Sequence, residues 1–294
     1  MRNRIKQRIF LLSLLLVLLT GCVSPVEPSP KSEDNKVIIA MLDTGISTTA
    51  IQSSNLLPGW NYVTGTEDTE DRINHGTAVA SVILGCESAG IEAMAADALL
   101  VALVVTDKVD GTVKGVTPEV LAQAIRDAVD KYNADIINIS IGIKKDVIAV
   151  REAVEYVLAR GAVVISAVGN EGESEDLYYP AAYDGVLGVG SHNKNGEISD
   201  FSQQNGTADI LAPGEDIWLA SRNGKTYGAK GTSYATAYVS AVLALLLTRQ
   251  PKLTANEIRQ MLILSARTAN GWLILDSVAA LEALTSNALP NNSK

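Results

Sequence analysis

The sequence predicts an α/β fold, a single domain with a doubly wound, mostly parallel sheet and helices on both faces. Several short runs are apolar at almost every position, which is typical of strands buried on both faces. Segments with helical periodicity and capping signals lie between these runs. The 294-residue chain is also long enough to bury a core without disulfide bonds.

The predicted strands follow one another with helical segments between them. The first, "KVIIAMLDTG", ends in Asp-Thr-Gly. The others are "ALLVALVVT" at 98–106, "ADIINISIG" at 134–142, "GAVVISAVGN" at 161–170 and "GVLGVGS" at 185–191. Because these runs do not alternate with polar residues, we expect them in the interior of the sheet.

Three local signals mark helix ends. Thr117 precedes Pro118, which combines a capping residue with proline at the first helical position. Gly161 is placed to end the helix predicted over "DVIAVREAVEYVLARG". Thr254 and Glu257 have the spacing of a capping box.

The two ends of the chain are predicted to lie outside the folded domain. Residues 1–21 have a basic start, an apolar run and small residues, as in a secretory signal. Residues 22–35 are rich in Pro and Ser, which predicts a flexible tether. The domain is expected over residues 36–284, and residues 285–294 form a polar tail.

The stretch Leu19-Thr20-Gly21-Cys22 resembles the lipobox of bacterial lipoproteins. In that class the chain is cut before the cysteine, which is then acylated. The resemblance implies that Cys22 is lipidated and anchors the protein to the extracytoplasmic face of a bacterial cell membrane. An ordinary secretory signal or a signal anchor is the alternative.

The composition argues against nucleic acid as a partner. The net charge is −9, and removing residues 1–21, which hold four basic and no acidic residues, makes it −13. Nucleic acids and anionic lipids bind clustered Lys and Arg. With Cys22 acylated, Cys86 is left alone, so we expect no disulfide and read Cys86 as a small buried side chain.

Four residues able to form a hydrolytic centre lie at the ends of predicted elements. Asp43 and Asn170 end strands, while His75 and Ser233 open the helical runs "HGTAVASVILGC" and "TSYATAYVSAVLALLL". Active sites of parallel sheets form beyond the carboxyl ends of the strands. Taken singly, each residue has an ordinary alternative, such as a capping serine or a turn asparagine.

Together the four blocks resemble the subtilisin family of serine endopeptidases, the subtilases. They read "MLDTGI", "NHGTAVAS", "SAVGNEG" and "KGTSYATAYVSA" and place Asp, His and Ser in the subtilisin order. The serine block does not match the G-x-S-x-G of α/β-hydrolases. The resemblance covers about residues 36–284 and implies a subtilisin-like fold.

The resemblance also implies a mechanism for hydrolysing peptide bonds. His75 would take the proton of Ser233, and Asp43 would hold the other imidazole nitrogen. The Asn170 side chain and the Ser233 N–H would donate to the oxyanion. Extended substrate would lie along six further residues: Ser140, Ile141, Gly142, Ala167, Val168 and Gly169.

Some features depart from the family pattern or stay open. Ala78 stands where subtilases have a second histidine, and Ala237 and Tyr238 stand where Pro and His are common. The acidic loop "NEGESEDLYYPA" either favours Arg or Lys in the substrate or is simply solvated. The remaining histidine, His192, is predicted to lie in a surface loop.

The predicted function is a serine endopeptidase that cuts peptides or proteins outside the cytoplasmic membrane. A narrower version is a dedicated peptide-processing (leader) protease. The alternative is a catalytically silent lipoprotein that uses the fold for binding or regulation. We expect a monomer, no cofactor and no obligatory metal, although structural calcium is left open because many subtilases bind it.

Overall fold

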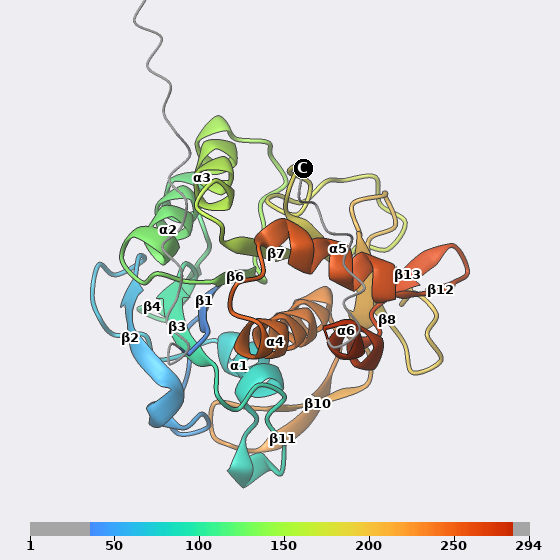
Figure 1. Ribbon diagram of the computed structural model, residues 1–294. Coiled ribbons are helices and arrows are strands. Elements are labelled where there is room, and N and C mark those ends of the chain that lie inside the picture. The colour runs from blue at the N-terminus through green and yellow to red at the C-terminus, as the bar shows by residue number, and fades with distance from the viewer. Residues whose placement is uncertain (1–35, 285–294) are drawn as a thin grey trace, which may run out of the picture.

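The computed structural model describes residues 36–284, and its centre is a nine-stranded sheet (Figure 1). The predicted signal peptide, Cys22, the tether and the polar tail lie outside these residues, so they stay predictions. The strands of the sheet are β1 (Ile38–Asp43), β2 (Leu56–Asn61), β3 (Leu99–Val104), β6 (Ile136–Ile139), β7 (Val163–Ala167), β8 (Leu187–His192), β9 (Ile210–Pro213), β12 (Arg267–Ala269) and β13 (Trp272–Ile274).

The sheet has the order β12-β13-β9-β8-β7-β6-β1-β3-β2. Its pairings are parallel except for that of β12 with β13. The prediction of a mostly parallel α/β sheet is therefore confirmed. Two antiparallel hairpins lie beside it, β4 (Asp107–Val109) with β5 (Thr112–Lys114) and β10 (Ile217–Ala220) with β11 (Thr226–Ala229).

Helices cover both faces of the sheet (Figure 1). One face carries α2 (Pro118–Asp130) and α3 (Ile148–Leu158). The other carries α1 (Gly76–Leu84), α4 (Thr232–Arg249), α5 (Ala255–Ser265) and α6 (Ser277–Ala283). Two short 3-10 helices, Ser53–Asn55 and Glu87–Ala89, lie in the connections.

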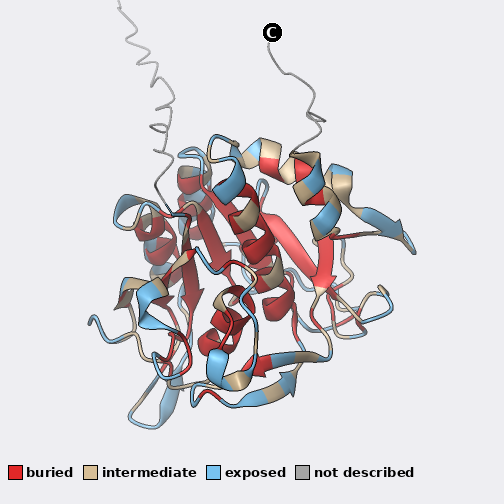
Figure 2. Ribbon diagram, turned by 60° about the horizontal axis from the view of Figure 1, so that its bottom comes forward, coloured by how far each residue is buried: buried red, intermediate tan, exposed pale blue. Residues whose placement is uncertain are grey.

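Strand β1 shows why the apolar runs predicted buried strands. Its successive side chains point to opposite faces of the sheet. Ile39 and Met41 pack with α1 and α4, while Ala40 and Leu42 pack with α2 and α3. Both sets are fully buried, and Figure 2 shows the buried residues concentrated in the central strands and in α4.

The predicted helix signals act as expected. The Thr117 side chain accepts the Val120 N–H, and Pro118 begins α2. Thr254 and Glu257 form the reciprocal capping box at the start of α5. After α3 the chain leaves through Gly161 at φ 85°, a left-handed conformation that glycine adopts without steric cost.

Other elements were not predicted. Strand β2 contains Pro58 and Gly59 and lies at the edge of the sheet, where a missing N–H is tolerated. Strands β9 and β13 are short and owe their place to pairing with distant strands. The prediction for His192 was wrong, because this residue ends β8 and is half-buried.

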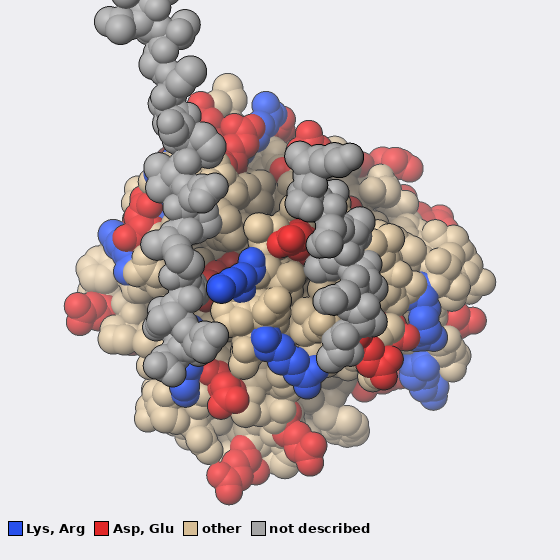
Figure 3. Space-filling view, in the orientation of Figure 1, with Lys and Arg blue, Asp and Glu red and all other residues tan. Residues whose placement is uncertain are grey.

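On the face of the molecule shown in Figure 3, acidic and basic side chains are interspersed. Within residues 36–284, none of the helices is both long and apolar enough to cross a membrane.

Candidate active site

The predicted acid and base are in direct contact. Asp43 ends β1 and His75 immediately precedes α1, and the His75 Nδ1 atom lies 2.7 Å from the Asp43 Oδ1 atom. The same carboxylate oxygen accepts the Thr44 N–H at 2.7 Å. Asp43 is fully buried, and within the described chain its Oδ2 atom has no hydrogen-bond partner. The carboxylate thus acts mainly on the imidazole.

This contact sets the protonation of the histidine. Burial alone would lower the pKa of His75, because it disfavours the charged form. The charge and hydrogen bond of Asp43, with a further contribution from the charge of Asp71, instead raise the His75 pKa above its ordinary value. An imidazole held in this way is a stronger base, as a proton acceptor for a serine requires.

Asp71 holds the loop that carries the histidine. This fully buried carboxylate accepts the backbone N–H groups of Ile73, Asn74 and Thr77 at 2.9, 2.7 and 2.9 Å. The Thr77 hydroxyl also donates to it, at 2.7 Å. These bonds hold Asn74 in a left-handed conformation, φ 79°, directly before His75. Sequence reasoning missed Asp71, because nothing local distinguishes it from the neighbouring acids.

The predicted nucleophile, Ser233, is the second residue of α4 and is buried. Its hydroxyl donates to the Ser140 carbonyl at 3.2 Å. The His75 ring lies beside the next residue, Tyr234, with 6.0 Å between ring centroids. The structure therefore brings the start of α1 and the start of α4 together. No hydrogen bond joins Ser233 and His75 in the described chain, and catalytic hydrogen bonds are often long without substrate.

A buried polar chain anchors the start of α4 to the sheet. Asn138 in β6 donates to the Ser240 hydroxyl at 2.8 Å and accepts from the Ser140 hydroxyl at 3.1 Å. The Ser140 hydroxyl also lies 3.3 Å from the Ser233 carbonyl. Buried polar groups need such partners, so this chain fixes how α4 meets the sheet near Ser233.

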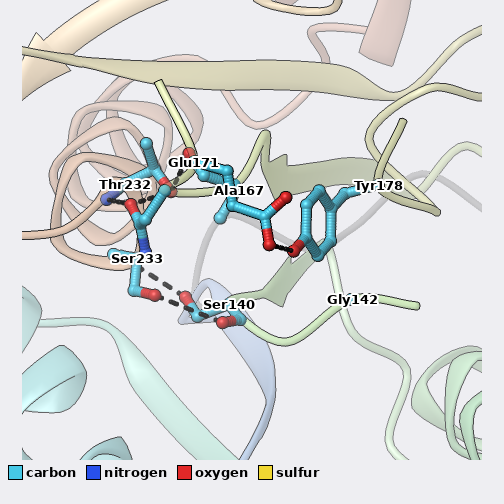
Figure 4. Close-up of a pocket in the computed structure, with 9 residues that line it drawn as sticks. Ser140, Gly142, Ala167, Glu171, Tyr178, Thr232 and Ser233 are labelled. Atoms are coloured by element: carbon cyan, nitrogen blue, oxygen red, sulfur yellow. Dashed lines mark hydrogen bonds between the residues drawn. The ribbon is translucent and has the colours of Figure 1, made fainter. Parts of the chain in front are cut away.

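Asn170 is oriented by the same helix. Its Oδ1 atom accepts the Thr232 N–H at 2.9 Å and the Thr232 hydroxyl at 3.0 Å. The side-chain oxygen is thus occupied, which leaves the amide NH₂ as the donating group. Asn170 and Ser233 line one pocket of about 320 Å³, and Figure 4 labels Ser233 beside Ser140 and Thr232 in this lining. The full lining is Ser140, Gly142, Ala167, Gly169, Asn170, Glu171, Tyr178, Thr232 and Ser233.

Four of the six predicted substrate-binding residues line this pocket, and two do not. Val168 is fully buried, and Ile141 packs against the core on the α2–α3 face. Their side chains therefore serve packing. Glu171 and Tyr178 line the pocket as well, and the Tyr178 hydroxyl donates to Glu171 at 2.8 Å. The other acidic side chains of this loop, Glu173, Glu175 and Asp176, are exposed and do not line the pocket.

The remaining sequence features have simple places. Cys86 is buried, with its sulfur 3.3 Å from the Ser88 hydroxyl. The His192 Nδ1 atom lies 2.7 Å from the Asn193 carbonyl oxygen, and burial lowers the pKa of this histidine. Residues 36–284 contain no cluster of three or more His, Cys, Asp or Glu side chains that could bind a metal ion.

Comparison with known proteins agrees with this geometry. The subtilase family (Peptidase S8) matches residues 34–288. The chain is 36% identical over 241 residues to the major intracellular serine protease of Bacillus subtilis (strain 168), which covers 76% of this chain and 74% of that protein.

The solved structures that resemble this chain include proteases described as maturation proteases. The protease domain of PatA matches with a TM-score of 0.75 and 28% identity, over 86% of this chain and 97% of that one. The prenylagaramide maturation protease PagA matches with a TM-score of 0.71 and 29% identity, over 86% of this chain and 95% of that one. The chain therefore belongs to the subtilase family and is a subtilisin-type serine endopeptidase.

Proposed function

We propose that Ser233 is the nucleophile of this endopeptidase, His75 its general base and Asp43 the group that orients the base. The observation that carries the proposal is the 2.7 Å contact between His75 and Asp43 at the carboxyl end of β1. The location of Ser233 in the pocket with Asn170, beside the helix that His75 opens, supports it further.

The proposed reaction uses one proton carrier in two steps. The Ser233 oxygen attacks the carbonyl carbon of the scissile bond while His75 Nε2 takes the hydroxyl proton. His75 then gives this proton to the leaving amine, and an acyl-enzyme remains. Water, deprotonated by His75, hydrolyses the ester and restores the serine. The Asn170 NH₂ and the Ser233 N–H donate to the oxyanion in both steps.

Labelling with a fluorophosphonate tests this assignment. The full chain is treated with the reagent, and the adduct is located by mass spectrometry. We expect one adduct on Ser233, and its loss in a His75→Ala variant that remains folded by circular dichroism. An adduct on another serine would refute the assignment. Failure of the folded wild-type chain to react would favour the alternative, a silent binding or regulatory protein.

We further propose that the domain acts outside the cytoplasmic membrane, held by acylated Cys22. The support is the basic and apolar segment that ends in Leu-Thr-Gly-Cys. A stable anchor would need more than one acyl chain on Cys22, because a single acyl chain binds a membrane only marginally. Wild type should incorporate a palmitate analogue and sediment with membranes. Cys22→Ala should do neither, and equal sedimentation of the two would contradict the anchor.

The narrower proposal is a dedicated peptide-processing protease. Its support is the likeness to a maturation protease, PagA, over most of both chains. Peptides outside cells with and without the enzyme would be compared by mass spectrometry. A few precursors should accumulate in its absence, each cut once by the purified protein. Loss of fragments from many unrelated proteins would instead indicate a general degradative role.

A further inference from the structure

A charged cluster lies beside the pocket and is not used by the reaction above. The Lys144 Nζ atom lies 2.8 Å from a carboxylate oxygen of Glu171 and 2.9 Å from one of Asp176. Glu171 also accepts the Tyr178 hydroxyl at 2.8 Å. The ammonium group stands 5.4 Å from the centre of the Tyr178 ring. The four side chains thus form one connected group from two loops.

The members of this group differ in their relation to the pocket. Glu171 and Tyr178 line it, as Figure 4 shows, whereas Lys144 does not. The Tyr178 ring lies against the backbone of Gly142 and Gly169, since a Cβ at either glycine would meet ring carbons at 3.4 and 2.7 Å. Glu171 is the one acidic residue of the pocket lining, and its charge is balanced from outside the cavity.

A buried side chain outside the loop, Gln203, holds the loop that carries Glu171 in place. The Gln203 side chain, fully buried, accepts the Glu171 N–H at 3.1 Å and donates to the carbonyls of Ser174 and Asp176. The ion pair persists around neutral pH. The hydrogen bond from Lys144 is the main cause that lowers the Glu171 pKa, and the bond to Glu171 is the main cause that raises the pKa of Lys144.

We propose that Lys144 is a specificity-determining residue, which pairs with Glu171 and so directs the pocket to uncharged substrate side chains. The inference rests on the proposed function, with this pocket taking the side chain that precedes the scissile bond. A Lys or Arg side chain entering the pocket would meet a carboxylate already paired, next to a like charge. The apolar Tyr178 ring and the glycine backbones instead favour an uncharged, apolar side chain.

The test is a change of preference on removal of the lysine charge. A synthetic peptide library is cut by the full chain, and the residue before each cut is read by mass spectrometry. Wild type should cut after uncharged side chains. Lys144→Met should raise cleavage after Lys and Arg, relative to Leu, about tenfold, because Glu171 is then unpaired. The double variant Lys144→Met with Glu171→Gln should return to the wild-type ratio.

Controls separate this inference from the proposed function. Lys145→Met removes the same charge from the neighbouring, exposed position and should leave the ratio unchanged. If wild type already prefers Lys or Arg, or if Lys144→Met shifts the ratio less than twofold, the inference is wrong while the proposed function stands. If no variant cuts any peptide and wild type is not labelled at Ser233, the proposed function itself fails, and the inference with it.

Discussion

Two sides of the candidate active site are built in opposite ways. The histidine side, comprising Asp43, Asp71 and His75, has both carboxylates fully buried. The selectivity side, comprising Lys144, Glu171 and Asp176, has side chains exposed by 48, 39 and 57%. Buried hydrogen bonds to charged groups are strong and fix geometry, whereas exposed ion pairs are weak and screened by salt.

The difference separates chemistry from selectivity. A change on the histidine side alters the base itself, so it should slow the reaction with every substrate. A change on the selectivity side alters only the charge that a substrate side chain meets. Substitutions on the two sides should therefore give different kinetic signatures: a slower reaction with every substrate on the histidine side, and a changed substrate preference on the selectivity side.

The largest effect is expected for Asp43→Asn. The amide can still accept the Thr44 N–H but no longer holds a negative charge against the imidazole. We expect kcat/KM to fall about 10⁴-fold for all peptides, because the imidazole is then in the wrong tautomer. Steady-state kinetics with apolar and basic peptides check this. A loss of less than tenfold, or one confined to some peptides, would show that the histidine side does not control the rate with every substrate.

Asp71→Ala should reduce stability as well as rate. It removes the acceptor of three backbone N–H groups and of the Thr77 and Thr44 hydroxyls. A buried donor without a partner costs about 1–3 kcal/mol. The two Thr77 donors and the Thr44 hydroxyl are buried, whereas Ile73 and Asn74 are half-buried, so we expect a loss of at least about 3 kcal/mol in the free energy of unfolding. Urea denaturation measures this loss.

Asp68 provides the matched control for Asp71. Its carboxylate pairs with Arg72 and is more than half exposed. Asp68→Ala should change the free energy of unfolding by about 0–1 kcal/mol. Equal losses for the two aspartates would show that Asp71 has no special role. Asp71→Asn, which keeps one acceptor oxygen, should fall between them.

Asn170→Ala should act on turnover and not on binding. Removing one oxyanion donor typically costs about 10²–10³ in kcat, and KM should change little. Thr232→Val is the control, because it removes one of the two hydrogen bonds that orient the Asn170 amide. Its loss in kcat should stay below about tenfold. Near-wild-type turnover in Asn170→Ala would remove this residue from the mechanism.

The smallest effects concern pH. Only neutral His75 can take the serine proton, so activity should rise with pH through the raised pKa of His75, above the ordinary 6.5. The sign for stability is opposite. A raised pKa in the folded state adds stability that is complete below the unfolded pKa and is lost as pH rises through the folded pKa.

Both trends can be measured on the same protein. The pH profile of kcat/KM locates the acid limb, and denaturation at a series of pH values compares wild type with His75→Gln. The stability difference should be larger at pH 5.5 than at pH 9. An acid limb below 6.5, or a difference that does not depend on pH, would mean that Asp43 and Asp71 do not hold the proton on His75.

Local pattern in the sequence determined the fold class and indicated the candidate reacting groups. Apolar runs predicted β1, β3, β6, β7 and β8, and Thr254 with Glu257 predicted the start of α5. Asp43, His75, Asn170 and Ser233 could be proposed because they lie at element ends and because the blocks around them together resemble those of subtilases. Each of these signals lies in residues that are close together in the sequence, so it can be recognised without the three-dimensional structure.

Tertiary structure decided what depends on distant partners. Asp71 became the support of His75 only because the loop folds back on α1 and on Thr44, 27 positions away. Lys144 and Glu171, also 27 positions apart, pair across two loops, and the acidic loop alone could equally have predicted basic selectivity. The electrostatic potential in a pocket depends on all the charged side chains near it. Their positions are set by tertiary structure and cannot be derived from a local sequence pattern.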